Sequence, residues 1–113
     1  MTEGVKTIIF PTKDITRAKS LFSVMLGPPP MDQPYYVGWN VAGQDVGLDP
    51  NGAARGMTGP VPYWHVADLR TRLKALLDAG ATLQQDVTDV GGGKLIASVT
   101  DADGNAIGLL QPS

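Results

Sequence analysis

The chain has one residue suited to acid–base chemistry near neutral pH, the single histidine His65. Imidazole can exchange protons with a substrate when a carboxylate orients it, and Asp45 and Asp49 are candidates for that partner. The same three side chains could instead hold a divalent cation, since imidazole and carboxylate are ordinary metal ligands. Alternatively, these residues carry out no chemistry. His65 then lies at a cavity rim or an interface, and Asp45 and Asp49 are solvated carboxylates at strand ends.

Cysteine is absent, so the chain has no thiolate metal ligand, thiol nucleophile or disulfide. The formal net charge is −2 and basic residues do not cluster, so nucleic acid and anionic membrane surfaces are poor partners. No apolar run approaches the roughly 18 residues of a membrane span, and the N-terminus lacks a signal-peptide pattern. We therefore expect a cytoplasmic protein that binds neither nucleic acid nor membrane.

Aromatic side chains gather in segments with the composition of strands. Flat rings on a curved sheet can stack on planar or apolar ligands at a small cost in side-chain entropy. Tyr36 and Tyr63 could line a cavity or pack in the core, and we expect Trp64 to pack in the core. The strand around Trp39 fits either register, so its ring could face either way. The candidate ligand-binding residues are Tyr36, Trp39, Asp45, Asp49, Tyr63 and His65.

One motif occurs twice along the chain and must position these residues. A short apolar strand, residues 6–10, leads to Asp14, an amphipathic helix and a glycine, and residues 61–66 lead in the same way to Asp68. Aspartate is a good helix N-cap because its carboxylate accepts hydrogen bonds from first-turn N–H groups. A repeat of this length is too long for a solenoid unit and predicts two similar modules. The apolar stripe of the first helix comprises Ile15, Ala18, Phe22, Met25 and Leu26.

The repeat divides a single domain, residues 1–113, into module one (5–50) and module two (60–113). Residues 51–59 are rich in glycine and lack periodicity, which predicts a linker. Neighbouring side chains of a strand point to opposite faces of a sheet. One face should pack under the helices: Ile8, Phe10, Trp64 and Val66. The other should border a cavity or a partner subunit: Thr7, Ile9, Val61, Tyr63 and His65.

Three segments resemble a known superfamily. They are the helix starts Thr12-Lys13-Asp14-Ile15 and Val66-Ala67-Asp68-Leu69, and the ending from Asp101-Ala102-Asp103-Gly104 to Gln111. Because these segments occur in this order along the sequence, the chain resembles the vicinal oxygen chelate superfamily. That superfamily includes glyoxalases, extradiol dioxygenases, and fosfomycin and bleomycin resistance proteins. The resemblance implies an α+β fold of two βαβββ modules, which form curved sheets around a cavity with one helix per module outside. It also implies a homodimer.

The resemblance also implies two metal ligands in each module of the metal-dependent members. One is a His or Gln seven residues before the capping Asp, and the other is usually a Glu or His in the last strand. The corresponding residues here are Thr7, Gly47, Val61 and Gly108. None is a good ligand for a divalent cation, which needs several converging N or O side chains. This disfavours glyoxalase, dioxygenase and metal-dependent transferase chemistry, and we expect no cofactor.

The leading hypothesis is a metal-independent small-molecule-binding protein, similar to the bleomycin resistance branch that sequesters an antibiotic without turnover. Stacking on Tyr36 and Tyr63, with attraction by Asp45 and Asp49, would suit a cationic or polar ligand. One alternative is an enzyme, a glyoxalase-like lyase or isomerase or a dioxygenase relative, with a relocated metal or an acid–base site at His65. Another alternative is a non-catalytic interaction module whose dimer matters more than its cavity.

Overall fold

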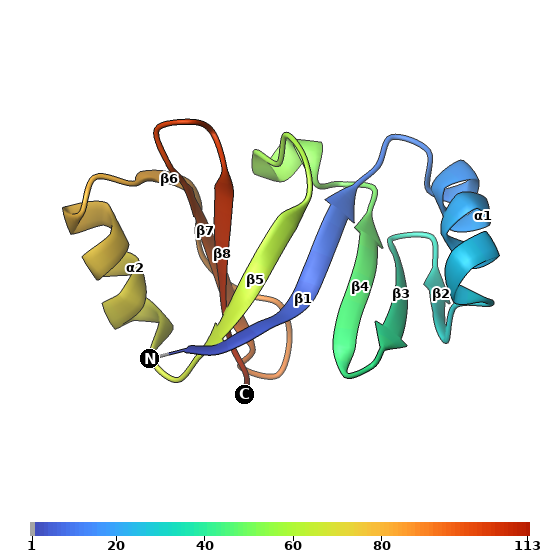
Figure 1. The fold of residues 1–113 in the computed structure, drawn as a ribbon, viewed down its shortest axis with the longest axis horizontal. Coiled ribbons are helices and arrows are strands. Elements are labelled where there is room, and N and C mark those ends of the chain that lie inside the picture. Colours follow the sequence, from blue (N-terminus) through green and yellow to red (C-terminus); the bar gives the residue numbers. More distant parts are fainter. Residues whose placement is uncertain (1) are drawn as a thin grey trace.

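The computed structural model describes residues 2–113, and its elements repeat in the predicted order. Module one comprises β1 (Thr2–Pro11), α1 (Ile15–Leu26), β2 (Met31–Gln33), β3 (Tyr36–Val41) and β4 (Gln44–Asp49). Module two comprises β5 (Val61–Val66), α2 (Leu69–Asp78), β6 (Thr82–Asp89), β7 (Leu95–Thr100) and β8 (Ala106–Gln111). The prediction of an α+β fold built from two βαβββ modules is confirmed (Figure 1).

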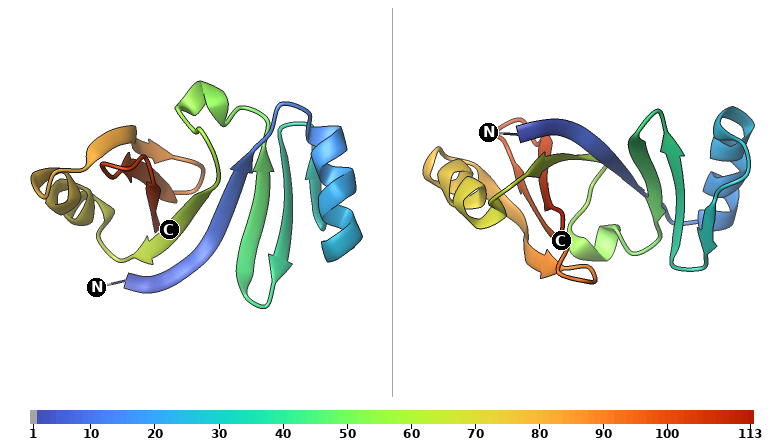
Figure 2. Two further views of the ribbon diagram at one scale, coloured as in Figure 1. Left: turned by 45° about the horizontal axis from the view of Figure 1, so that its top comes forward. Right: turned by 90° about the horizontal axis from the view of Figure 1, so that it is seen from below.

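The eight strands form one mixed sheet in the order β2-β3-β4-β1-β5-β8-β7-β6. Each module places its first strand beside its last, since β1 pairs in parallel with β4 and β5 pairs in parallel with β8. The modules meet at the antiparallel pair of β1 and β5 in the middle of the sheet. The sheet curves strongly, and the two helices lie outside it at opposite ends of the molecule (Figures 1 and 2).

Aspartate begins both helices, as the sequence predicts. Asp14 Oδ1 accepts a hydrogen bond from the N–H of Arg17 at 3.1 Å, and Asp68 Oδ1 accepts one from the N–H of Thr71 at 3.2 Å. Gly27 follows α1 with a φ of 82°, in the left-handed region that glycine adopts without strain. Within residues 2–113, neither helix has the length and apolar character needed to cross a membrane.

Two strands differ from the sequence-based expectation. β1 begins at Thr2 rather than at residue 6, and it passes Gly4 at a φ of 97° with two shifts of register against β5. β2 was not predicted, because its three residues are exposed and show no apolar alternation. It is held as an edge strand by pairing with β3, with Met31 opposite Gly38.

Each helix covers a separate hydrophobic cluster. The cluster at α2 comprises Val66, Leu69, Leu73, Ala97, Val99 and Leu109. The cluster at α1 comprises Val37, Trp39 and Leu48, with Phe10 and Phe22 packed against them. Phe10 and Val66 therefore lie on the helix side, where strand parity placed them. The predicted burial of Trp64 is wrong: it is 38 % exposed, because it lines an open groove beside α2 that the helix does not cover.

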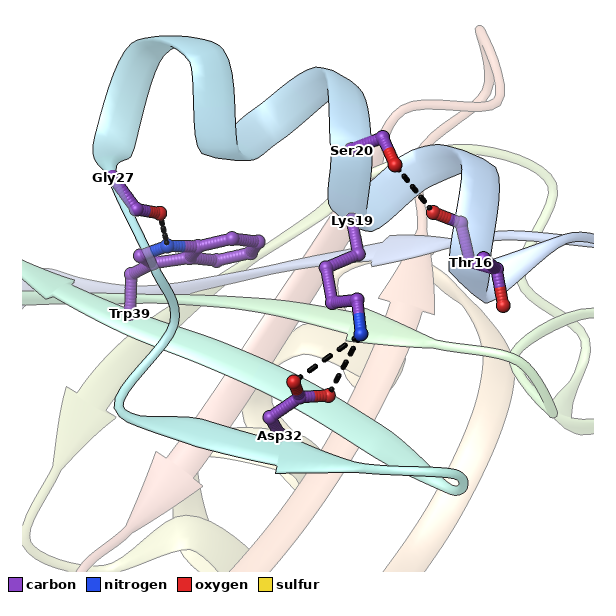
Figure 3. Close-up of polar contacts among 6 residues, drawn as sticks. All are labelled: Thr16, Lys19, Ser20, Gly27, Asp32 and Trp39. Atoms are coloured by element: carbon purple, nitrogen blue, oxygen red, sulfur yellow. Dashed lines mark hydrogen bonds and ion pairs between the residues drawn. The ribbon is translucent and has the colours of Figure 1, made fainter.

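Trp39 connects the end of α1 to the sheet. Its indole stacks on Phe22 with ring centroids 5.9 Å apart. Its Nε1 donates a hydrogen bond to Gly27 O at 2.8 Å (Figure 3). Nearby, Lys19 Nζ of α1 donates to both carboxylate oxygens of Asp32 in β2 (Figure 3). These contacts decide the register that the sequence left open, since they place the Trp39 ring on the helix side of the sheet.

The outer face of α1 is apolar, whereas that of α2 is mostly polar. Leu21, Val24 and Met25 are 67 %, 88 % and 74 % exposed. The predicted burial of Met25 is wrong, because the buried stripe runs through Ala18, Phe22 and Leu26 at spacings of four and leaves Met25 beside it. This contrast between two otherwise similar modules marks α1 as a surface that a partner could cover.

We predict that Trp39→Phe lowers the free energy of unfolding by about 2–3 kcal/mol. The substitution leaves a gap beside Phe22 and removes the only indole donor that reaches Gly27 O. The matched control, Trp64→Phe, should cost less than about 1 kcal/mol, because Trp64 is partly exposed. Urea unfolding followed by circular dichroism measures both. Equal losses would contradict the structural role assigned to Trp39.

Candidate functional site

A cavity of about 650 Å³ lies on the face of the sheet opposite the helices, and both modules line it. This volume is within the range of pockets that hold drug-sized molecules. Apolar and aromatic side chains dominate its wall, with a few polar and charged groups among them. Its lining includes Thr7, Ile9, Tyr36, Asp45, Asp49, Arg55, Met57, Tyr63, Lys94, Ile96 and Leu110.

The structure brings four of the six candidate ligand-binding residues to the wall of this cavity: Tyr36, Asp45, Asp49 and Tyr63. Trp39 borders the cavity along β3, but its indole lies on the helix side and stacks on Phe22. His65 is not among the residues that line the cavity, although its ring contacts Thr7, which does. That the four residues bind a ligand stays a prediction.

The positions that correspond to metal ligands in the superfamily meet near the junction of the modules. Ile9 of β1 pairs with Gly47 on one side and with Val61 on the other, and Gly108 pairs with Tyr63. Val61 is fully buried in a hydrophobic cluster, and the two glycines have no side chain. Within residues 2–113, no three His, Asp or Glu side chains come close enough together to hold a metal ion. The residues present therefore do not fit such a site.

Tyrosine rings occupy the space that ligand side chains at Gly47 and Gly108 would need. A Cβ atom at Gly47 would overlap the Tyr36 hydroxyl and lie 2.7 Å from Tyr36 Cε1. A Cβ atom at Gly108 would lie 2.6 Å from Tyr63 Cδ1. Gly38, the partner of Gly47 across β3 and β4, would also collide with the Tyr36 ring. Each ring thus rests on bare backbone at a ligand position.

Asp49 is a buried carboxylate at the end of β4, and the segment after β4 pairs with it. Its side chain is 7 % exposed, and Arg55 donates a hydrogen bond to its Oδ2. The N–H of Asn51 donates to Oδ1 at 2.8 Å. Both oxygens are therefore engaged by the protein, which stabilises the charge of the carboxylate away from bulk water.

Both cavity tyrosines are held in the protonated form. Burial, and then the negative charge of Asp49, raises the pKa of Tyr63 to about 12. Burial also raises the pKa of Tyr36 above its usual value, with smaller contributions from Asp45 and Asp49. A phenol is already neutral at physiological pH with its ordinary pKa of about 10, so the raised values extend this neutral range into alkali and each hydroxyl can donate a hydrogen bond. The cavity therefore carries two neutral hydroxyl donors.

His65 lacks the arrangement that an acid–base catalyst requires. Its Nε2 lies 3.1 Å from Thr7 Oγ1, and within residues 2–113 no carboxylate forms a hydrogen bond with its ring. Partial burial, followed by the charges of Lys6 and Lys94, lowers the pKa of His65 below its usual value, so the ring is neutral at pH 7. Asp45, one proposed partner, instead accepts a hydrogen bond from Asn40 Nδ2 at 2.9 Å.

Sequence reasoning missed the part that residues 51–59 play. This segment, expected to be a linker, contains a short 3₁₀ helix, Ala53–Arg55, and lines the cavity through Arg55 and Met57. An arginine six residues after a carboxylate at a strand end was the available signal. It could not be used, because the turn that returns Arg55 to Asp49 depends on backbone hydrogen bonds from the N–H of Gly52 to Asp49 O and from the N–H of Arg55 to Gly52 O, which no sequence pattern announces.

No protein-family model and no curated protein matches the sequence. Solved structures match closely in fold. A glyoxalase/bleomycin resistance protein/dioxygenase superfamily member from Vibrio splendidus 12B01 is 19 % identical, with a TM-score of 0.70 over 94 % of this chain and 97 % of that one. Methylmalonyl-CoA epimerase from Mycobacterium tuberculosis is 16 % identical, with a TM-score of 0.65 over 99 % and 89 %.

A third solved structure is described as NAD-dependent benzaldehyde dehydrogenase from Legionella pneumophila. It is 13 % identical, with a TM-score of 0.74 over 95 % of this chain and 98 % of that one. At these identities the likeness concerns the fold alone. The fold is that of the vicinal oxygen chelate superfamily, as the helix starts and the chain ending predicted.

The raised pKa of Tyr63 predicts a loss of stability in alkali. Its pKa is about 12 when folded and about 10 when unfolded, so between these values the folded state binds the extra proton. Stability is therefore fully present below pH 10 and falls as pH rises through 12, by on the order of 2 kcal/mol. Urea unfolding at pH 9 and pH 11.5 should show a smaller fall for Tyr63→Phe than for the unmodified chain. The matched control, Tyr35→Phe at an exposed tyrosine, should leave the fall unchanged.

Proposed function

We propose that this protein binds a small, antibiotic-like ring compound without a metal ion and without turning it over. The observation that carries the proposal is the cavity of about 650 Å³ in which Tyr36 and Tyr63 cover the glycines at the superfamily's ligand positions. At those positions the chain presents flat apolar rings and neutral hydroxyls instead of charged metal ligands. Such a wall suits a planar ligand, because aromatic rings stack with little loss of entropy.

The charges of the cavity wall support an uncharged or zwitterionic ligand. Asp45 and Asp49 are balanced in formal charge by Arg55 and Lys94. Because Asp49 already pairs with Arg55, little of its attraction remains for a cation. The sequence suggested that both aspartates attract a cationic ligand. Because Asp49 is paired with Arg55, this attraction rests mainly on Asp45.

Sequestration demands less of the side chains than the reactions named for the structural neighbours. It needs a cavity that fits the ligand, whereas epimerisation or lyase chemistry needs positioned acids, bases or metal ligands. His65 pairs with Thr7 rather than with a carboxylate, which weakens the enzymatic alternative. The test below distinguishes a binding protein from an enzyme with a relocated metal.

We predict that no divalent cation stabilises the protein. EDTA-treated protein should unfold at the same temperature with and without Zn²⁺, Ni²⁺, Mn²⁺ or Fe²⁺. In a panel of planar, uncharged or zwitterionic antibiotics small enough for the cavity, at least one compound should raise the Tm in a saturable manner. A ligand at 100 times its Kd stabilises the folded state by about 2.7 kcal/mol, which corresponds to several degrees.

Two results would contradict this proposal. A saturable rise in Tm with one cation, lost in His65→Ala, would indicate a relocated metal site. Turnover of methylmalonyl-CoA, or of the methylglyoxal–glutathione hemithioacetal, would identify an enzyme. Binding of no compound in the panel, together with the absence of turnover, would instead favour an interaction module.

We also propose that the chain forms a homodimer, and that the apolar outer face of α1 takes part in the contact. Val24 and Met25 are among the most exposed large apolar residues, and burying them would remove unfavourable apolar surface from water. A homodimer contact is self-complementary, so the apolar residues of one copy would meet those of the other.

Sedimentation velocity should therefore find a dimer whose dissociation Val24→Asp promotes at least tenfold. The matched control is Ala75→Asp, which places the same charge at an exposed position of α2, at the other end of the molecule from α1. A monomeric unmodified chain at about 50 μM would contradict the homodimer. A dimer that both substitutions leave intact would place the contact elsewhere.

A further inference from the structure

The hydroxyl groups of Tyr36 and Tyr63 have no hydrogen-bond partner among residues 2–113. Tyr63 as a whole is 3 % exposed, yet no fully enclosed side-chain oxygen or nitrogen in this part of the chain lacks a partner. The Tyr63 hydroxyl must therefore open into the cavity that its ring lines. A buried tyrosine hydroxyl ordinarily pairs with the protein, so this one is available to a bound molecule.

The backbone holds both rings in place. Gly38 and Gly47 lie opposite each other on β3 and β4, and the Tyr36 ring rests on both. The Tyr63 ring rests in the same way on Gly108, its partner on β8. A ring that packs against a neighbouring strand has little rotational freedom to lose, so its hydroxyl is preorganised for binding.

On the basis of the proposed function, we propose that the Tyr36 and Tyr63 hydroxyls recognise an uncharged ring compound by donating hydrogen bonds to its carbonyl or ring-nitrogen acceptors. The two donors come from different modules, Tyr36 from β3 and Tyr63 from β5. A ligand held by both would therefore bridge the modules across the cavity.

The surroundings of the hydroxyls favour an uncharged acceptor. Both phenols are protonated at physiological pH, as tyrosine ordinarily is, and burial raises their pKa further. Asp45 and Asp49 are balanced in formal charge by Arg55 and Lys94, so the cavity wall offers no surplus charge to an ionic ligand. Both oxygens of Asp49 already accept hydrogen bonds, from Arg55 and from the N–H of Asn51. Donation to a neutral acceptor is therefore the chemistry that the two phenols offer.

The test compares two probes of one shape, 9-fluorenone and fluorene, which differ by a carbonyl in place of a methylene group. Calorimetric titration should find fluorenone bound more tightly than fluorene by the unmodified protein. Tyr63→Phe and Tyr36→Phe should each weaken fluorenone binding by about three- to tenfold, the loss expected for one neutral hydrogen bond, and leave fluorene binding unchanged. Trp64→Phe, a partly exposed aromatic residue that does not line this cavity, is the control and should change neither.

The infrared carbonyl band of bound fluorenone provides a second measurement. Hydrogen bonding should lower its frequency in the unmodified protein, and each Tyr→Phe variant should reverse part of that shift. Equal affinity for the two probes, unchanged by either substitution, would overturn the inference and leave the binding function intact. Failure of both probes to bind would contradict the proposed function and the inference together. Thermal unfolding of the variants verifies that they remain folded.

Discussion

The antiparallel pairing of β1 with β5 is the constraint on which the rest of the molecule depends. It joins two four-stranded units into one sheet, with Thr7 opposite Tyr63 and Ile9 opposite Val61. Side chains alternate between the faces of a strand, so this register decides which residues of both modules share the concave face. A shift by one residue would turn Tyr63 toward the helix side and Trp64 toward the cavity. The cavity is therefore a product of this junction, and neither module contains it alone.

The glycines at positions 47 and 108 and the rings of Tyr36 and Tyr63 depend on one another. Gly47 and Gly108 leave bare backbone on the cavity side of the sheet, and the two rings fill the space that a Cβ atom would need. The rings turn this part of the wall into an apolar surface with a hydroxyl on each side. Restoring a ligand would require displacing a ring as well as adding a donor.

Much of the fold and part of the site could be predicted from the sequence. Local rules were sufficient for the caps at Asp14 and Asp68 and for the parity of Phe10 and Val66, because each depends on a few neighbouring residues. Features that depend on contacts between residues far apart in the sequence could not be predicted. The side of Trp39 depends on Gly27 and Phe22, and the position of Arg55 depends on the path of residues 51–59. The short edge strand β2 carries no apolar pattern and exists only through pairing with β3.

The ion pair of Asp49 and Arg55 has a consequence for inheritance. Replacing Arg55 alone would leave the buried Asp49 carboxylate without its charged partner, which costs more than the intact pair contributes. The reverse replacement is milder, because the Arg55 side chain is 48 % exposed and water can solvate its charge. Position 55 is therefore constrained for as long as position 49 carries a carboxylate, although it lies in an irregular segment. A segment that looks free to vary is thus tied to the buried end of β4.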